Sequence, residues 1–259
     1  MSRSHDAVVE AQFGSQADAY VASSVHAEGE DLDALTRLVA NVRPDQALDL
    51  GTGGGHVAYR LAPHVRAVVA VDLSPAMLDA VKETARQRGI PNIETCAAAA
   101  ECLPFETASF DLIACRYSAH HWQDWEAGLR EARRVLKPGG LAMFVDVISP
   151  GVAAFDTHLQ AIELLRDPSH VRNYTEAEWN AALARAGFRV RRTEKRRIRM
   201  DYASWVGRMR TAQPHQVAIR SLQQLAAEQT AAYFTIEADG SFSIDALQIE
   251  ASACSAGER

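Results

Sequence analysis

A glycine-rich segment that directly follows an apolar run restricts this chain more than any other feature. Its sequence is Asp49-Leu50-Gly51-Thr52-Gly53-Gly54-Gly55-His56, and Ala47 and Leu48 precede it. Glycines after a buried strand let the backbone turn sharply and let a ligand approach without side-chain interference. A helix that starts after such a turn directs its free N–H groups at that ligand. The segment therefore predicts a strand, a ligand-binding turn and a helix, in that order.

The following hundred residues alternate short apolar runs with helical patterns. Helices are expected from Ser74-Pro75, an N-cap followed by a first-turn proline, and over 124–136, ended by Pro138-Gly139-Gly140. The expected strands cover 47–50, 67–71, 110–114 and 141–147. Apolar strands that alternate with helices are typical of a parallel sheet covered on both faces.

The flanking segments are predicted to elaborate this core. Two helical patterns occupy 5–42, and 152–186 is helical with a capping box, Thr175-x-x-Glu178. Residues 189–199 alternate as a strand does, and 233–251 predict two strands joined by a hairpin turn at Asp239-Gly240. Neither a repeat nor a low-complexity linker divides the chain, so we expect one domain over 1–259.

Composition and charge exclude several classes of function. The 27 basic and 33 acidic residues give a net charge of −6, which disfavours broad phosphate-driven binding to nucleic acid. The one basic cluster, 189–199, lacks aromatic residues for stacking on bases, so a solvated strand face is favoured over an RNA or DNA site. Four scattered cysteines offer no metal-ligand spacing, so we expect no metal. No apolar run is long enough for a membrane span and no signal peptide begins the sequence, which predicts a cytoplasmic protein.

The glycine spacing and Asp49 distinguish this turn from a dinucleotide-binding turn, and a second aspartate, Asp72, predicts a ribose contact. The G-x-G-x-x-G pattern requires glycine where His56 stands, and Asp49 places a carboxylate that would repel a pyrophosphate and suits a cationic ligand. Asp72 ends the next strand, where a carboxylate accepts both ribose hydroxyls in doubly wound folds. The alternative is that Asp72 is a solvated loop residue.

Read together, these segments resemble the class I S-adenosylmethionine-dependent methyltransferases of the type 11 family, in the branch similar to ubiquinone/menaquinone-type enzymes. The resemblance covers residues 10–190 by the order of its motifs. Beyond the glycine turn, the motifs that carry it are Val71-Asp72-Leu73-Ser74-Pro75-Ala76-Met77-Leu78, Ala99-Ala100-Glu101-Cys102-Leu103-Pro104-Phe105, Ser109-Phe110-Asp111-Leu112-Ile113, His120-His121-Trp122 and Glu131-Ala132-Arg133-Arg134-Val135-Leu136-Lys137-Pro138-Gly139-Gly140.

The resemblance implies a Rossmann-like, doubly wound α/β fold. Its sheet would have seven mostly parallel strands with helices on both faces, an N-terminal helical lid and a C-terminal antiparallel hairpin. Within the single domain, it implies a lid over 1–45, a donor-binding core over 46–150, a helical acceptor-side cover over 151–186, and C-terminal strands and helices over 187–259.

The resemblance also implies S-adenosyl-L-methionine as the cofactor and S-adenosyl-L-homocysteine as its product. Asp49 would lie near the methionine ammonium group and Asp72 at the ribose, with Leu73 and Met77 beside the adenine. The other implied cofactor contacts are Gly51, Thr52, Gly53, Gly55, Ala99, Ala100, Glu101, Cys115 and Arg116. Ala99 departs from the family, which usually carries an aspartate there; the missing hydrogen bond is worth about 0.5–1.5 kcal/mol, so weaker donor binding is expected.

Catalysis and acceptor binding have weaker signals. His121, with His120 and Tyr117 nearby, is the candidate general base; the alternative is that these histidines only begin a helix. Tyr20 is a candidate catalytic or contact residue on the lid, and His26, which follows it, is a candidate acceptor-binding residue. The lid pattern also fits a packing helix. A polar segment between two helices offers three candidate ligands for an anionic acceptor, or else forms a solvated loop; its candidates are Arg166, His170 and Arg172.

The sequence therefore predicts a methyltransferase that acts on a small organic acceptor at carbon, oxygen or nitrogen. An NAD-type oxidoreductase is disfavoured by the glycine spacing and by Asp49. A non-catalytic S-adenosylmethionine-binding sensor or scaffold stays open, as does the choice between a monomer and a homodimer.

Overall fold

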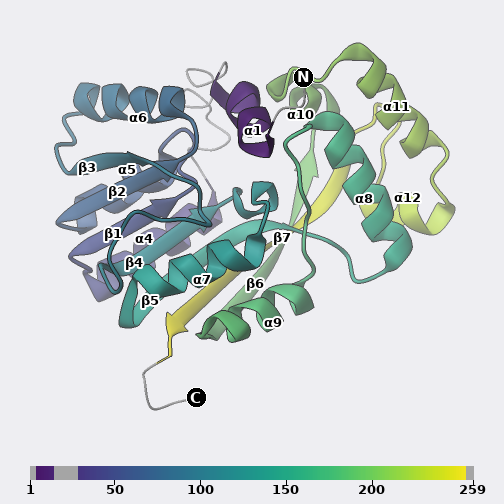
Figure 1. The fold of residues 1–259 in the computed structure, drawn as a ribbon. Coiled ribbons are helices and arrows are strands. Elements are labelled where there is room, and N and C mark those ends of the chain that lie inside the picture. Colours follow the sequence, from purple (N-terminus) through teal and green to yellow (C-terminus); the bar gives the residue numbers. More distant parts are fainter. Residues whose placement is uncertain (1–3, 15–28, 255–259) are drawn as a thin grey trace.

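Seven strands form one sheet in the described part of the chain, residues 4–14 and 29–254 of a computed structural model (Figure 1). The strand order is β3-β2-β1-β4-β5-β7-β6. The strands are β1 (Gln46–Leu50), β2 (Ala67–Asp72), β3 (Ile93–Ala97), β4 (Phe110–Arg116), β5 (Leu136–Ile148), β6 (Phe188–Met200) and β7 (Phe242–Ala253).

The order reverses between β1 and β4. The chain runs from β1 outward through β2 to β3, then returns to place β4 on the other side of β1, and all of these pairs are parallel. β5 continues the parallel set, whereas β7 lies antiparallel between β5 and β6. The expected mostly parallel, doubly wound sheet is confirmed, and its crevice lies at the carboxyl ends of β1 and β4.

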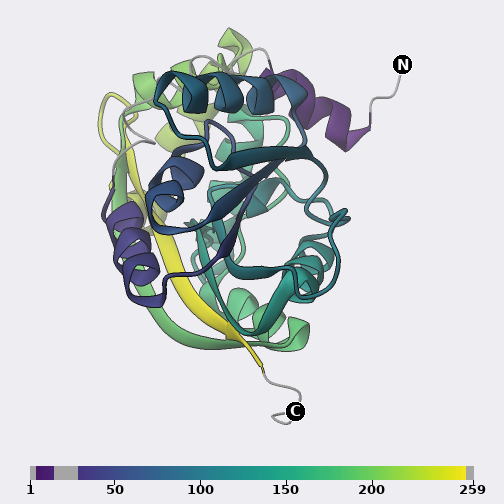
Figure 2. The same cartoon turned by 90° about the vertical axis from the view of Figure 1, so that its left-hand side faces the viewer.

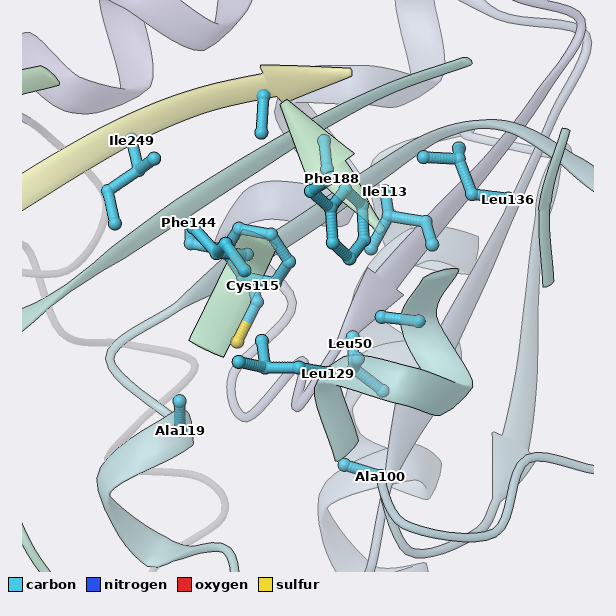
Figure 3. Close-up of a cluster of buried hydrophobic side chains, with 14 of the residues drawn as sticks. Leu50, Ala100, Ile113, Cys115, Ala119, Leu129, Leu136, Phe144, Phe188 and Ile249 are labelled. Carbon is cyan, nitrogen blue, oxygen red and sulfur yellow. The ribbon is translucent and has the colours of Figure 1, made fainter. Parts of the chain in front are cut away.

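Helices cover both faces of the sheet, as expected. On one face, α4 (Glu30–Val42), α5 (His56–Leu61) and α6 (Pro75–Gln87) supply Leu35, Val57 and Val81 to a core with Val68 and Leu112. Alternate strand residues point the other way, to α7 (Trp125–Val135) and α9 (Glu176–Ala186). Figure 3 shows part of that second core, which includes Ile113, Leu129 and Phe144.

Several local predictions about helix ends are confirmed. The Ser74 hydroxyl accepts the backbone N–H of Met77 at 3.3 Å and caps α6. Thr175 and Glu178 form the reciprocal capping box of α9. α7 ends at Val135, before the predicted stop at Pro138-Gly139-Gly140, and these three residues lie instead at the start of β5.

A third apolar cluster extends the molecule beyond the carboxyl ends of the parallel strands (Figure 1). Its helices are α8 (Ala153–Arg166), α10 (Tyr202–Arg208), α11 (Gln213–Gln224) and α12 (Glu228–Phe234). Leu159, Trp205 and Phe234 pack there against Phe242 and Ile244 of β7. None of the helices in the described residues is both long enough and apolar enough to cross a membrane.

The predicted C-terminal hairpin is wrong in its first half. Tyr233 and Phe234 belong to α12, and the turn at Asp239-Gly240 joins this helix, not a strand, to β7. Both edges of β7 are already paired, with β5 and with β6, so no edge is left for a strand over 233–238. Figure 2 shows β6 and β7 running side by side.

The two described helices of the segment expected to form a lid, residues 1–45, lie in different places. α1 (His5–Gly14) places Val9 and Phe13 against the cavity described below. α4 instead packs on the sheet face through Leu32, Leu35 and Val39. Of the described residues in 1–45, α1 and the first turn of α4 therefore line the cavity.

Candidate functional site

A cavity of about 570 Å³ opens at the carboxyl ends of β1, β2 and β4. This is the position where ligands bind in open doubly wound sheets. We call the wall made by residues 49–54, 71–73, 77, 98, 100 and 101 the glycine-loop side. The wall formed by His120, His121, Glu163, Arg166, Asp167 and Asn173 is the histidine side.

The glycine turn adopts the backbone conformations that its sequence predicts. Gly51, Gly53 and Gly55 have φ angles of 74°, 48° and 79°, values that residues with a Cβ adopt at a cost. The N–H groups of Gly51 and Thr52 both donate to the carbonyl of Val71, which ties the turn to β2. Gly51, Thr52 and Gly53 line the cavity, whereas Gly55 caps α5 behind it, where a Cβ would lie 2.8 Å from Tyr59.

Asp49 presents a buried carboxylate to the cavity. Its Oδ2 atom accepts the Thr52 hydroxyl at 2.6 Å and the Ala58 N–H at 2.9 Å. Its Oδ1 atom is buried and accepts no hydrogen bond from the described residues. Burial raises the pKa of Asp49 to about 7. An unpartnered oxygen of this kind is costly unless a ligand donates to it, and a cationic donor suits it best.

Asp72, the last residue of β2, hydrogen bonds to the same turn. Its Oδ2 atom accepts the N–H of Gly53 at 2.8 Å, and its Oδ1 atom accepts the N–H of Ser74 at 2.9 Å. Burial raises the pKa of this carboxyl group as well. Each carboxylate oxygen has more than one lone pair, so both can still accept a hydroxyl group from a ligand.

Most of the other expected cofactor contacts lie on the glycine-loop side. Leu73, Met77, Ala100 and Glu101 line the cavity there. Ala98 lines it too, although the sequence did not single it out, and Ala99 does not.

Cys115 and Arg116 take different positions from those expected. The Cys115 side chain is buried in the core beneath α7 (Figure 3) and does not line the cavity. Adjacent strand residues face opposite sides, so Arg116 lines the cavity, where its guanidinium pairs with Asp31. The Cys115 side chain therefore packs in the core instead of facing the cavity, contrary to its expected position.

On the histidine side, a short 3₁₀ turn, η2 (Ala119–His121), presents two imidazoles. His120 donates from Nδ1 to Oδ1 of Asp146 at 2.6 Å, and its backbone N–H donates to Oδ2 of the same carboxylate at 3.2 Å. Although burial opposes it, the charge of Asp146 raises the pKa of His120 above its ordinary value.

His121 has a different environment. Its Nδ1 lies 3.1 Å from the carbonyl of Ser169, and the edge of Phe13 packs against its ring. Burial, aided by the neighbouring charge of His120, lowers the pKa of His121 to about 4. His121 therefore stays neutral and weakly basic at neutral pH.

The three residues predicted to bind an anionic acceptor do not lie together in the structure. Arg166 lines the cavity, but its guanidinium lies 3.3 Å from Glu163 and donates to the carbonyl of Trp205 at 3.0 Å. His170 is buried beside Gln160 and does not line the cavity. Arg172 pairs with Asp156 at 3.1 Å, also away from the cavity.

Two further predicted site residues, Tyr20 and His26, fall outside the described residues.

Sequence reasoning missed four polar residues that lie on the histidine side or beside it: Asp146, Glu163, Asp167 and Asn173. Asn173, whose Nδ2 atom is buried without a hydrogen-bond partner among the described residues, directly follows the polar segment 166–172, so extending that segment by one residue would have found it.

The basic face of β6 is neutralised by acidic neighbours. Lys195 pairs with Glu176, Arg197 with Asp245, and Arg199 with Glu237, at 2.6–3.1 Å. Lys195 and Arg197 agree with the solvated strand face favoured from the sequence, whereas Arg196 and Arg199 of the same cluster line the cavity.

Comparisons with known proteins agree with this geometry. A family model described as a methyltransferase domain matches residues 48–144. The uncharacterized protein YafE of Escherichia coli is 43% identical over 201 residues, which cover 78% of this chain and 97% of YafE. The uncharacterized methyltransferase YcgJ of Bacillus subtilis is 35% identical over 77% of this chain and 79% of its own.

The solved structure of YcgJ superposes with a TM-score of 0.83 and 30% identity over 87% of this chain and 98% of that one. A demethylmenaquinone methyltransferase of Chlorobaculum tepidum is 37% identical over 109 residues, 42% of this chain and 43% of that enzyme.

Proposed function

The chain belongs to the methyltransferase family, and from this membership we propose that it moves a methyl group from S-adenosylmethionine to a small organic acceptor. The observation that carries the proposal is the buried Oδ1 atom of Asp49 on the wall of the cavity, which has no hydrogen-bond partner in the described part of the chain. A cationic ligand compensates this atom, whereas a pyrophosphate does not. S-adenosylmethionine carries two cationic groups, an ammonium and a sulfonium.

The residues of the glycine-loop side fit the parts of such a donor. We propose that Asp49 holds the ammonium group and that Asp72 accepts the ribose hydroxyls. Leu73 and Met77 would flank the adenine, and Ala100 and Glu101 would border its edge. Gly51, Thr52 and Gly53 would pass beneath the donor, and Arg116, already paired with Asp31, would border its amino-acid end.

The protein's part in methyl transfer is mainly one of position. When bound, S-adenosylmethionine supplies an electrophilic methyl group for an in-line displacement. Holding the acceptor in line with that methyl group contributes roughly 7–11 kcal/mol to the lowering of the barrier. Val9 and Phe13 of α1, which line the cavity, would help to exclude water from it. The histidine side would receive the acceptor, with Arg166 as one contact.

Calorimetric titration of the full chain tests donor binding. S-adenosylhomocysteine and S-adenosylmethionine are each expected to bind, and NAD is expected not to bind. Binding of NAD without binding of either sulfur nucleoside would refute the proposal.

A transfer assay separates an enzyme from a sensor. The protein is incubated with methyl-labelled donor and a metabolite extract, and label is expected to enter small organic products. Donor binding without any transfer would favour the sensor or scaffold alternative.

A further inference from the structure

We propose that His120, positioned by Asp146, is the general base of this reaction and that the acceptor presents an ionisable hydroxyl group. The inference rests on the proposed methyl transfer. It assigns the role of general base, predicted for His121, to the neighbouring His120. It also restricts the acceptor to compounds with an ionisable hydroxyl group.

The Asp146 carboxylate holds the His120 ring in one orientation. Besides the 2.6 Å bond from Nδ1 of His120, the carboxylate accepts the backbone N–H of His120 at 3.2 Å and that of Val147 at 2.8 Å. Asp146 is 2% exposed, so water does not compete for these bonds. Because Nδ1 donates to Asp146, Nε2 carries the lone pair.

The backbone of His120 is fixed as well. Its carbonyl accepts the N–H groups of Val171 and Arg172 at 2.8 and 3.2 Å, which joins η2 to the loop that precedes α9. His120 lines the cavity, and no described residue hydrogen bonds to Nε2. A basic nitrogen is thus held on the cavity wall and left for a ligand.

The two neighbouring histidines do not share this chemistry. The ring centres of His121 and His170 lie 4.1 and 5.8 Å from that of His120. His121 contacts a backbone carbonyl through Nδ1, and His170 contacts the Gln160 side chain through Nε2. Burial lowers the pKa of His121 to about 4 and that of His170 to about 2. Nε2 of His121 lies 4.0 Å from the Asp167 carboxylate, beyond hydrogen-bond distance, whereas Nδ1 of His120 lies 2.6 Å from Asp146. Of the three described rings, His120 is therefore the one whose protonated form is stabilised by a hydrogen-bonded carboxylate.

The base also lies close to the glycine turn. Ser118, two residues before His120, packs so tightly against Gly51 that a Cβ on Gly51 would lie 2.5 Å from the Cβ of Ser118. The same Ser118 accepts the indole N–H of Trp122 at 3.3 Å, which ties both ends of η2 together. An acceptor that reaches His120 therefore stands beside the turn assigned to the donor.

The reaction balances with these groups alone. The acceptor oxygen forms a bond to the methyl carbon while the carbon–sulfur bond breaks and its electron pair stays on sulfur. The hydroxyl proton passes to Nε2 of His120. The positive charge lost from the sulfonium appears on the imidazolium, next to the Asp146 carboxylate. A neutral amine would need no base before attack, whereas a hydroxyl group of moderate acidity matches an imidazole.

The other carboxylates near His120 already have partners of their own. On α8, Glu163 is paired with Arg166 at 3.3 Å, and in the loop Asp167 accepts the Ser169 hydroxyl at 2.5 Å. The charges and titratable groups that face His120 are Asp146 from β5, His121 from η2, Glu163 from α8, and Asp167 and His170 from the loop.

The test uses labelled S-adenosylmethionine and para-substituted phenols that decrease in acidity: 4-nitrophenol, 4-chlorophenol, phenol and 4-methoxyphenol. The full chain is compared with His120→Gln, Asp146→Asn and His121→Gln, and with His215→Gln, an exposed histidine on α11, as control. For the weakly acidic phenols, His120→Gln is expected to lower kcat by about 100-fold or more. For 4-nitrophenol, assayed at a pH above its own pKa so that it is largely ionised, the loss should be much smaller.

Two further readouts separate a base from a structural residue. Histidine NMR should show a titration above the ordinary value that disappears in His120→Gln and shifts to lower pH in Asp146→Asn. S-adenosylhomocysteine binding, followed by calorimetry, should be unchanged in every variant.

An equal loss for all phenols, a loss confined to His121→Gln, or no transfer to any phenol while the nucleoside still binds would overturn the inference. Absence of nucleoside binding in the unaltered chain would instead refute the proposed function.

Discussion

Gly51 and Ser118 lie so close together that no side chain fits between them. A Cβ built on Gly51 would lie 2.5 Å from the Cβ of Ser118 and closer still to its hydroxyl. Gly51 belongs to the turn after β1, and Ser118 follows β4. The contact therefore joins the two strand ends on either side of the reversal in strand order.

We predict that Gly51→Ala destabilises the protein by about 2–4 kcal/mol, from overpacking together with the cost of a positive φ. Gly53→Ala is the matched control, because φ is 48° there but an added Cβ meets nothing within 4 Å. Urea unfolding should show a smaller loss for Gly53→Ala. Equal losses would mean that Ser118 does not limit this position, and Ser118→Gly should partly rescue Gly51→Ala.

Asp49 should make stability depend on pH. Burial raises its pKa from 3.8 to about 7, so between these values the folded protein retains a proton that the unfolded chain has released. The free energy of unfolding therefore falls as pH rises through this window, by up to about 1.4 kcal/mol per unit.

Asp49→Asn should remove this contribution and flatten the profile between about pH 5 and 7. Asp72, whose pKa is also raised, is present in both proteins, so their difference isolates Asp49. Urea midpoints measured across this range provide the comparison, and parallel profiles would contradict the assignment.

Asp72→Ala is expected to weaken S-adenosylhomocysteine binding by about 1.5–3 kcal/mol, because it removes an ionised acceptor and releases the N–H groups of Gly53 and Ser74. Asp79→Ala serves as the control, since Asp79 is an exposed residue of α6 that lies 3.9 Å from Lys82. Calorimetry should show a loss only for Asp72→Ala. Unchanged affinity would remove Asp72 from the site.

Cys115→Ser should affect stability and not donor binding. The thiol is buried among apolar side chains, so a hydroxyl there costs about 1–3 kcal/mol. Cys102→Ser, at an exposed position, should cost far less. Thermal unfolding measures the difference. If Cys115→Ser lowered nucleoside affinity at unchanged stability, Cys115 would return to the binding site.

Much of the site's glycine-loop side was predictable because its signals are local. Positive φ at Gly51 and Gly53, the cap at Ser74, and Asp72 at the end of β2 depend on residues a few positions away. The orientation of Cys115 was also within reach, since strand alternation places it opposite Arg116. The prediction for Cys115 used its position in the motif and not that alternation, which directs its side chain into the core.

The histidine side depends on contacts between residues far apart in the sequence. His120 meets Asp146 across 26 positions, and Arg116 meets Asp31 across 85. Periodicity carries no information about such pairs, because they are set by which strand ends lie side by side. A pair of adjacent histidines therefore offered no sign of which one hydrogen bonds to a carboxylate.

The sequence by itself determined the class of fold, the glycine turn and the identity of the two acidic residues that flank it, because apolar periodicity, capping and glycine conformation act over short distances. The tertiary structure decided that β7 pairs on both edges and leaves no edge for a strand over 233–238, that Cys115 packs inward, and that His120, not His121, hydrogen bonds to a carboxylate. These outcomes follow from competition between distant segments for the same strand edge, core volume or buried charge.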